Sequence, residues 1–230
     1  MLSFRQGSLL GEYVKEPAGV IAGIDEVGRG CLAGPVVTAA VVLPPKYILP
    51  YLKDSKQLTP KRREALAKSI REVALAWSIG LIGQGTIDKV NILQATFMAM
   101  AMAAARLPLT PNFLYIDGNK TIPTGILQRF WRKHKTEVLP RQQAVVKGDV
   151  QIPVISAASI LAKTYRDSIM RFLAKRWPVY GFEDHVGYGS KYHLQKLKEY
   201  GPCPLHRLTF RGVVNKPKIK EVQGSLLAFL

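Results

Sequence analysis

Short apolar runs alternate with amphipathic stretches along most of this chain. The runs at 20–24, 36–43, 78–83, 113–116 and 144–146 are brief and rich in β-branched or aromatic residues, which is typical of buried strands. Longer stretches between them carry apolar residues at helical spacing. This alternation of strands with helices predicts a layered α/β domain.

The first helix is predicted to begin near Thr59. Pro60 then falls at the first helical position, where its missing N–H costs nothing. The helical spacing of four apolar residues predicts the buried face of this helix: Leu66, Ile70, Val73 and Trp77. Further helices are predicted over 86–106, over 157–177 behind a Ser156 cap, and over 191–199.

The segment 120–143 has a less regular pattern. Arg129, Arg132 and neighbouring basic residues surround Phe130 and Trp131. This mixture predicts an exposed basic-aromatic helix or loop.

The end of the chain differs in composition from the rest. Beyond residue 213 a basic, proline-broken stretch is followed by an apolar one. A chain of 230 residues is long enough for one well-buried domain. We therefore expect a single domain over 1–213, followed by a tail over 214–230 to which the sequence assigns no role.

The chain is strongly basic. It has 33 Lys and Arg residues against 16 Asp and Glu, a formal net charge of +17 and a pI near 10.0. This excess predicts a polyanionic partner, either nucleic acid or an anionic membrane surface, and the alternative is a charge that serves only solubility. No apolar run has the length of a membrane span, and the first residues lack the apolar core of a signal peptide. The two cysteines give neither metal-binding spacing nor a disulfide framework, so we expect a cytoplasmic protein. We also expect a monomer without a membrane partner.

Acidic residues stand at the ends of three predicted strands: Asp25, Glu26, Asp117 and Asp149. Four carboxylates brought together would raise one another's pKa values. Divalent ions such as Mg²⁺ or Mn²⁺ would make such a cluster favourable, and a pair of these ions can support phosphodiester cleavage. The alternative is a hairpin whose acidic tip is simply solvated.

The adjacent Asp25 and Glu26 raise a geometric objection, because neighbours on a strand face opposite sides. We therefore expect the strand to end, bend or bulge at this pair, which the glycines shortly after it would permit. The turn Gly28-Arg29-Gly30 would also let backbone groups approach a sugar-phosphate chain closely. A plain tight turn with a solvated arginine is the alternative.

Other familiar sites are absent from the sequence. It contains no Walker-type phosphate loop, and the glycines after the first strand miss the dinucleotide-binding spacing. Four histidines occur, of which only His185 and His193 lie close together in the chain. A zinc site is therefore not expected.

Seven motifs in order along 22–210 resemble those of bacterial ribonuclease HII: AGIDEVGRGCLAGPVV, DSKQL, YIDGN, VVKGD, ISAASILAKTYRD, HVGYGSKYH and HRLTF. Each motif is short, but the ordered set is specific and spans nearly the whole chain. The resemblance implies an α/β, RNase H-like fold, with a mixed sheet flanked by helices and a C-terminal helical extension. It also implies a metal-dependent endonuclease that hydrolyses the RNA strand of RNA–DNA hybrids and incises at single ribonucleotides in duplex DNA.

The resemblance further implies roles for particular residues. The family's four metal-binding carboxylates, which would hold Mn²⁺ or Mg²⁺ at a two-metal site, fall on Asp25, Glu26, Asp117 and Asp149. Its junction-reading turn falls on Gly28, Arg29 and Gly30, and its sugar-stacking residue on Tyr188. Asp167 is the alternative fourth ligand. It lies inside a predicted helix, however, where a structural cap or an ion pair explains it better.

Two features depart from the family pattern. The segment between Asp117 and Asp149 is longer than usual, and Gly189 follows Tyr188 where Pro-Thr is common. An added glycine would loosen the loop that carries the tyrosine.

Two alternative functions compete with such a nuclease: a non-catalytic protein that binds hybrids or duplexes, and a related metal nuclease acting on structured DNA. The four retained carboxylates argue against the first rival.

Overall fold

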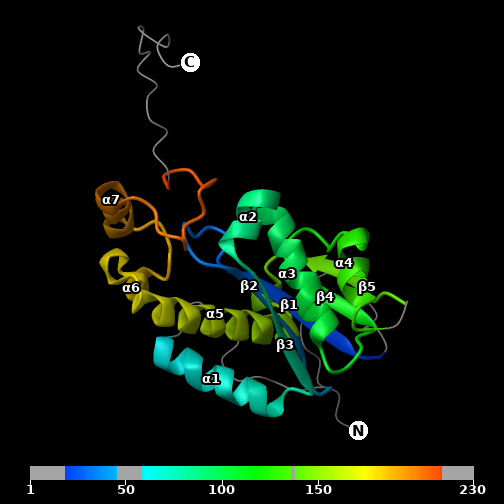
Figure 1. Cartoon of the computed structure of the whole chain (residues 1–230). Helices are drawn as coiled ribbons and strands as arrows, with labels where there is room; N and C mark the ends of the chain where they lie inside the picture. The colour runs from blue at the N-terminus through cyan, green and yellow to red at the C-terminus, as the bar shows by residue number, and fades with distance from the viewer. Residues whose placement is uncertain (1–18, 46–58, 136–137, 214–230) are drawn as a thin grey trace, which may run out of the picture.

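A five-stranded mixed sheet forms the centre of the protein (Figure 1). The structure is a computed structural model that describes residues 19–45, 59–135 and 138–213. The strands follow the order β3-β2-β1-β4-β5 and are β1 (Ile21–Val27), β2 (Val36–Val42), β3 (Ala76–Ile82), β4 (Phe113–Asp117) and β5 (Arg141–Val145). β2 runs antiparallel to β1 and β3, whereas β4 runs parallel to β1 and β5.

Helices cover the sheet and extend beyond it. In chain order they are α1 (Pro60–Val73), α2 (Gln84–Val90), α3 (Ile92–Arg106), α4 (Thr124–Trp131), α5 (Pro153–Ala174), α6 (Phe182–His185) and α7 (Lys191–Tyr200). Two short 3₁₀ turns are η2 (Gly148–Val150) and η3 (Pro178–Tyr180).

β2 shows how the sheet separates two hydrophobic cores. All of its residues are buried, and successive side chains point to opposite faces. Ala40 and Val42 pack with residues of α3 and α4. Ala39 and Val41 pack on the other face with residues of α1 and α5. The sheet is therefore the middle of three layers, as Figure 1 shows.

Two glycines let helices approach the sheet closely. A Cβ atom at Gly23 on β1 would collide with the Val154 backbone near the start of α5. A Cβ atom at Gly80 on β3 would collide with the Ala99 backbone on α3. Gly23 thus brings α5 directly against the strand that carries the predicted acidic pair.

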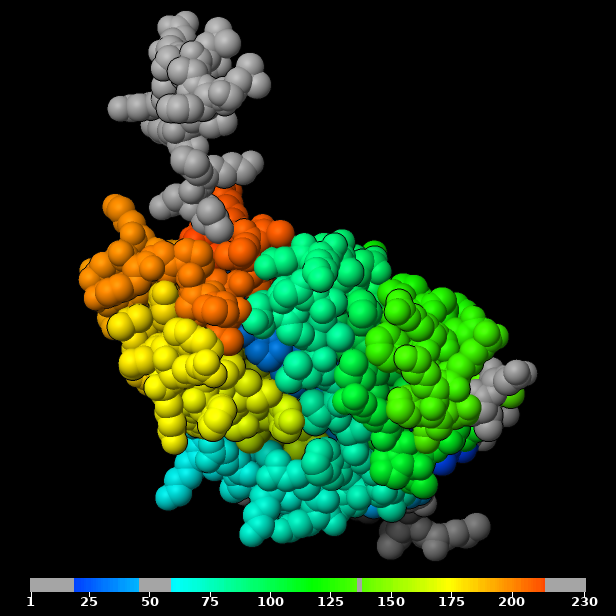
Figure 2. Space-filling model, viewed as in Figure 1, coloured from blue at the N-terminus to red at the C-terminus, as the bar shows by residue number. Residues whose placement is uncertain are grey.

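The far end of α5 packs against a small helical extension. Met170 and Ala174 join Phe182, Leu197 and Leu205 in a hydrophobic cluster of its own. In Figures 1 and 2 this extension, coloured yellow to orange, lies beside the blue segment that joins β1 to β2. The mixed sheet, its flanking helices and this extension confirm the predicted fold class.

Two predicted helices have different boundaries. α1 ends at Val73, and Trp77 lies on β3 with 38% of its surface exposed, so its place in a buried helical stripe was wrong. The predicted helix over 86–106 is two helices, because Asn91 has a positive φ of 68° that helical backbone excludes. The Asn91 side chain accepts a hydrogen bond from the Gln94 N–H and so begins α3.

Ser156 does not cap a helix as predicted, because α5 already begins at Pro153. Its hydroxyl donates instead to the carbonyl oxygens of Ile152 and Asp149. The second of these bonds ties the start of α5 to η2.

The prediction of an exposed basic-aromatic segment is wrong for its tryptophan. Trp131 is fully buried at the end of α4, and its indole N–H donates to the Val138 carbonyl oxygen at 3.0 Å. Phe130 is partly buried against the same core. Arg129 and Arg132 are exposed, so the prediction holds for these basic residues.

Some predictions fall where the structure gives no description. The tail over 214–230 and the DSKQL motif lie outside the described residues. Within the described ranges, no helix combines the length and the apolar character needed to cross a membrane.

Candidate active site

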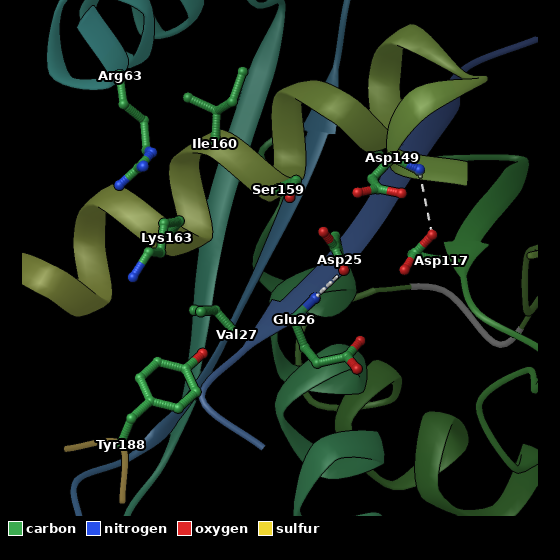
Figure 3. A pocket seen from close by; sticks show the side chains of 10 residues that line it. All are labelled: Asp25, Glu26, Val27, Arg63, Asp117, Asp149, Ser159, Ile160, Lys163 and Tyr188. Atoms are coloured by element: carbon green, nitrogen blue, oxygen red, sulfur yellow. Dashed lines mark hydrogen bonds between the residues drawn. The ribbon is translucent and has the colours of Figure 1, made fainter. Parts of the chain in front are cut away.

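A cavity of about 330 Å³ lies where β1 and β4 end (Figure 3). It is lined by Asp25, Glu26, Val27, Arg63, Asp117, Asp149, Ser159, Ile160, Lys163 and Tyr188. In Figure 3 the four carboxylates lie on one side, and Arg63, Lys163 and Tyr188 lie on the other. The structure thus brings together all four predicted metal ligands and the predicted sugar-stacking residue.

The acidic pair lies on a continuous strand, so the predicted strand end or bulge is wrong. β1 remains paired with β2 as far as Val27. Its pairing with β4 covers only Ile21–Ile24, so Asp25 and Glu26 lie beyond the last pair on that side. Their side chains leave from opposite faces, yet both border the opening beside β4.

Asp117 and Asp149 reach the cavity from two neighbouring segments. Asp117 is the last residue of β4, and Asp149 lies in η2 after a left-handed Lys147 with φ of 55°. The Asp149 N–H donates to Asp117 Oδ1 at 3.2 Å. The Ser156 hydroxyl donates to the Asp149 carbonyl oxygen, so both segments are fixed relative to α5.

Burial raises the pKa values of both carboxyl groups on β1. Asp25 is 6% exposed, and its pKa lies well above the usual range because of burial and, next, the charges of Glu26 and Asp117. Hydrogen bonds from Ser159 and from the Glu26 N–H oppose that rise. Burial also raises the pKa of Glu26, against the effect of the Arg29 guanidinium at 3.2 Å. A cation at this wall would favour the ionised forms.

Glu26 Oε2 is buried and has no hydrogen-bond partner among the described residues. Such an oxygen costs free energy unless a donor or a cation meets it. As they stand, the described residues include no group of three or more His, Cys, Asp or Glu side chains arranged to hold a metal ion. The carboxylates therefore line one cavity without closing around a common point. Their oxygen-only chemistry and the unpaired oxygen fit a hard divalent cation such as Mg²⁺ or Mn²⁺.

Basic side chains form the opposite wall. Lys163 Nζ lies 2.8 Å from Asp167 Oδ1, and Arg63 Nη1 lies 3.5 Å from Asp167 Oδ2. Asp167 therefore forms ion pairs and does not line the cavity, whereas Asp149 does. The charges of Arg63 and Lys163 suit a phosphate oxygen.

The Gly28-Arg29-Gly30 turn follows the acidic pair and is held from behind by Arg207. The fully buried Arg207 guanidinium donates to the carbonyl oxygens of Gly28 at 2.7 Å, Arg29 at 2.9 Å and Gly34 at 2.9 Å. It forms no ion pair with a carboxylate of the described residues, and burial lowers its pKa to about 10. These turn residues do not line the cavity; Arg29 adjoins it through its ion pair with Glu26.

A second buried arginine joins this loop to the segment before Tyr188. The Arg166 guanidinium donates to Pro35 O at 2.9 Å, Ala33 O at 3.0 Å and Val186 O at 2.7 Å. Like Arg207, it is fully buried. Arg166 therefore supports both the loop that follows the Gly28-Arg29-Gly30 turn and the segment that leads to Tyr188, the two segments predicted to face substrate.

Tyr188 presents its ring to the cavity with 42% of its surface exposed. Lys163 Nζ lies 5.9 Å from the ring centroid. The Tyr188 N–H donates to His185 O at 2.9 Å, and its carbonyl oxygen accepts from the Ser190 N–H at 2.9 Å. Tyr188 therefore has backbone hydrogen bonds on both sides although Gly189 follows it.

A family model described as ribonuclease HII matches residues 22–213. This chain belongs to the ribonuclease HII family. The ribonuclease HII of Nitratidesulfovibrio vulgaris is 54% identical over 202 residues, covering 88% of this chain and 90% of the relative. That of Endomicrobium trichonymphae is 48% identical over 193 residues, covering 84% of this chain and 86% of the relative.

Solved structures agree with this ribonuclease HII assignment. The ribonuclease H2 of Pyrococcus horikoshii has a TM-score of 0.70 at 27% identity, covering 85% of this chain and 95% of that one. The PCNA:RNase HII complex of Archaeoglobus fulgidus has a TM-score of 0.60 at 29% identity, covering 78% of this chain and 86% of that one. The predicted family is confirmed, and the protein is a ribonuclease H, a hydrolase that acts on the RNA strand of RNA–DNA hybrids.

Sequence reasoning missed several residues of this ribonuclease HII site. Ser159 and Lys163 both reach the cavity from α5. Their four-residue spacing, on a helix that is otherwise largely apolar, is a signal that the sequence contains. The supporting roles of Arg166 and Arg207 have no such signal, because their partners are distant backbone carbonyls.

Proposed function

We propose that this ribonuclease HII incises at single ribonucleotides in duplex DNA, as well as within longer hybrids, by a two-metal-ion mechanism. The observation that carries the proposal is one cavity with four carboxylates on one side and Arg63, Lys163 and Tyr188 on the other. Such a cavity offers metal ligands, phosphate-binding cations and an aromatic ring at the same place. A duplex-binding protein without chemistry would not need the buried carboxylates.

The carboxylates of Asp25, Glu26, Asp117 and Asp149 would hold Mn²⁺ or Mg²⁺. When bound, two such ions supply activation of a water molecule and stabilisation of the leaving oxygen in phosphodiester hydrolysis. The chain itself fixes the positions of its ligands. The Asp149 N–H restrains Asp117, and the Glu26 N–H restrains Asp25 at 2.7 Å.

Arg63 and Lys163 are proposed to hold the phosphate next to the one that is cut. Both side chains line the cavity, and Asp167 keeps both in place by ion pairs. Their side chains are mostly shielded from solvent, at 15% and 28% exposure, so screening by salt is reduced there. Bound substrate thus meets positive charge on one side and metal ligands on the other.

Ribonucleotide selection is proposed to rest on the Gly28-Arg29-Gly30 turn and on Tyr188. A Cβ atom at Gly30 would find no other atom within 4 Å, so a sugar edge can approach this backbone. A 2′-hydroxyl can exchange hydrogen bonds with such groups, which distinguishes RNA from DNA. The Tyr188 ring would cover the neighbouring deoxyribose, where a further hydroxyl would clash or lack a partner.

We also propose the setting in which this enzyme acts. A nuclease with this selectivity suits the repair of DNA that contains ribonucleotides, carried out in the cytoplasm by a monomer. The strongly basic chain supports binding to the phosphates of such a duplex. Residues 1–213 would form the catalytic domain, to which the tail over 214–230 is appended.

One assay tests the proposal most directly. A duplex DNA with a single embedded ribonucleotide is incubated with enzyme in Mg²⁺, in Mn²⁺ or in chelator, beside an all-DNA duplex and a uniform hybrid. We expect incision at the ribonucleotide only when metal is present, and no incision of the all-DNA duplex. Cleavage of the hybrid alone would contradict the proposed activity at embedded ribonucleotides, and cleavage of the all-DNA duplex would favour a nuclease that acts on structured DNA. Activity in chelator would contradict the metal-dependent mechanism.

A further inference from the structure

Two histidines contact the backbone of the Tyr188 segment, and a third contacts one of them. His185 Nε2 lies 2.7 Å from Tyr180 O, and His185 Nδ1 accepts from the Gly187 N–H at 3.2 Å. His193 Nδ1 lies 2.8 Å from the Tyr188 carbonyl oxygen. His193 is fully buried and does not line the cavity. The functional site described above makes no use of this cluster.

The other ring nitrogen of His193, Nε2, contacts a third histidine, His206. His193 Nε2 lies 2.9 Å from His206 Nε2, and His206 Nδ1 accepts from the Cys203 N–H at 2.9 Å, with Cys203 O at 3.2 Å. A carbonyl oxygen can only accept, so a hydrogen bond between His193 Nδ1 and Tyr188 O requires the proton to be on Nδ1. In the neutral pair, His206 Nε2 donates to His193 Nε2, and every ring nitrogen then has a partner of the right kind. Burial lowers the pKa of both rings, to about 4 for His206, which favours this neutral state.

The distance between the two rings excludes a metal ion between them. Zinc lies about 2.0–2.1 Å from each imidazole nitrogen, so two ligands of one ion stand well over 2.9 Å apart. A direct hydrogen bond is the remaining explanation. The histidine pair therefore acts on protein atoms rather than on a cofactor.

The segment before Tyr188 requires such support because its backbone is strained. Val186 is β-branched and has a positive φ of 43°, and Gly187 follows with a φ of 88°. A strained conformation of this kind persists only where surrounding contacts fix it. Arg166 holds the Val186 carbonyl oxygen, His185 holds the Gly187 N–H, and His193 holds the Tyr188 carbonyl oxygen.

We propose that His193 is a positioning residue for ribonucleotide selection: its Nδ1–H, fixed by His206 on the other nitrogen, holds the Tyr188 backbone so that the ring faces the cavity. This inference rests on the proposed role of Tyr188 in reading the sugar. The pair His193 and His206 would then matter for discrimination between substrates more than for cleavage itself. His193 and His206 would act through Tyr188 and would not touch the substrate.

Two substitutions separate the proposed hydrogen bond from the bulk of the side chain. In His193→Asn, the amide nitrogen takes the place of Nδ1 and can still donate to Tyr188 O. In His193→Gln, the amide takes the place of Nε2, which keeps the His206 contact and loses the bond to Tyr188. Tyr188→Ala is the reference for complete loss of the ring. Each variant is assayed for kcat and KM on a single embedded ribonucleotide and on a uniform hybrid, at matched thermal midpoints.

We expect His193→Gln to lower the ratio of embedded-ribonucleotide to hybrid cleavage about tenfold, toward the value of Tyr188→Ala, and His193→Asn to stay within about threefold of wild type. Equal ratios for the Gln and Asn variants would overturn the proposal. If Tyr188→Ala leaves the ratio unchanged, it is the proposed role of Tyr188 that fails. If Tyr188→Ala lowers the ratio and His193→Gln does not, only the positioning role fails.

A measurement on the unaltered protein covers the case of a variant that does not fold. The ¹⁵N chemical shifts of the imidazoles report which ring nitrogen carries the proton. We expect protonated Nδ1 and unprotonated Nε2 in His193, and the reverse in His206. A His193 protonated on Nε2 alone would overturn the proposal, since its Nδ1 could not then donate to Tyr188.

Discussion

The main-chain N–H of Asp149 donates to Asp117 Oδ1 at 3.2 Å, although 32 residues separate the two in sequence. This bond links η2 to the end of β4 and places both carboxyl groups on one wall of the cavity. The amide oxygen of an asparagine at position 117 could accept the same bond. Substitution there can therefore remove a charge while keeping the local structure.

Asp117→Asn is expected to abolish cleavage in Mg²⁺ because it removes a charged ligand from the proposed metal set. Retention of the bond from the Asp149 N–H should keep the thermal midpoint within about 3 °C of wild type. Steady-state cleavage of a hybrid and a thermal melt, both with wild type as the control, measure the two quantities. A variant that cuts within a few-fold of wild type would exclude Asp117 as a ligand.

Asp149→Asn is expected to be far more damaging to cleavage than Asp167→Asn. Asp149 lines the cavity, whereas Asp167 forms ion pairs with Lys163 and Arg63 outside it. The Asp167 variant loses the ion pairs with Lys163 and Arg63 and should mainly raise KM, since those two side chains would hold the phosphate less precisely. Rates on one hybrid at equal folded content test the order. The reverse ranking would identify Asp167 as the fourth ligand.

Binding to a hybrid should weaken steeply as salt rises, because a chain of net charge +17 releases counterions from the phosphates it contacts. The logarithm of affinity should fall linearly with the logarithm of salt concentration, by roughly 0.7–0.9 per phosphate contact. Titrations in Ca²⁺ or chelator measure affinity without cleavage. Arg63→Ala should reduce the slope, with Lys68→Ala on the outer face of α1 as the control. A flat response would contradict a phosphate-based interface.

Tyr188→Phe should keep most activity because the ring face, rather than the hydroxyl, is proposed to contact the sugar. Tyr188→Ala should lose about tenfold or more on a single embedded ribonucleotide and less on a uniform hybrid, where no junction is read. The comparison uses kcat/KM on both substrates for both variants. Equal losses on the two substrates would contradict the assignment, as would a Phe variant no better than Ala.

Without metal, the carboxyl groups of Asp25 and Glu26 should make the protein less stable as pH rises. Their pKa values are raised in the folded state, so the folded state holds protons that the unfolded chain has already released. Their contribution is present below the ordinary carboxyl range and is lost as pH rises through the folded pKa. In chelator, Asp25→Asn should therefore gain stability relative to wild type between about pH 4 and pH 7.

Thermal melts of wild type and Asp25→Asn across that range isolate this contribution from other titrating groups. Mg²⁺ or Mn²⁺ should reverse the order of the two proteins near neutral pH, because only wild type has the full ligand set. A constant difference at every pH would show that the pKa of Asp25 is not raised.

The strands and the four carboxylates could be predicted because each depends on local pattern. Asp25 and Asp117 stand at the ends of apolar runs that form β1 and β4, whereas the predicted run 144–146 overlaps only the end of β5, whose other residues are polar. The break at Asn91 could not be read from helical periodicity, since the apolar pattern continues through it. The burial of Trp131 was missed because its neighbours in sequence are basic, whereas its neighbours in space are apolar.

The strand end or bulge expected at Asp25 and Glu26 was wrong for a different reason. Neighbouring side chains on a strand point to opposite faces, and the objection assumed that the sheet separates those two faces. At Asp25 and Glu26, however, β1 is no longer paired with β4, so no strand lies on that side. Both side chains can then reach the same opening. The point at which β4 stops pairing with β1 makes this opening possible, and the residues around Asp25 and Glu26 do not indicate that point.

The bond from Arg207 to Gly28 joins residues 179 positions apart. During synthesis the strands of the sheet emerge first, and the glycine turn lacks its internal donor until nearly the whole domain has left the ribosome. A nascent chain shorter than 207 residues would carry the acidic wall but would lack the guanidinium that holds this turn. The loop between β1 and β2 can therefore reach its final conformation only after the C-terminal end of the domain has been synthesised.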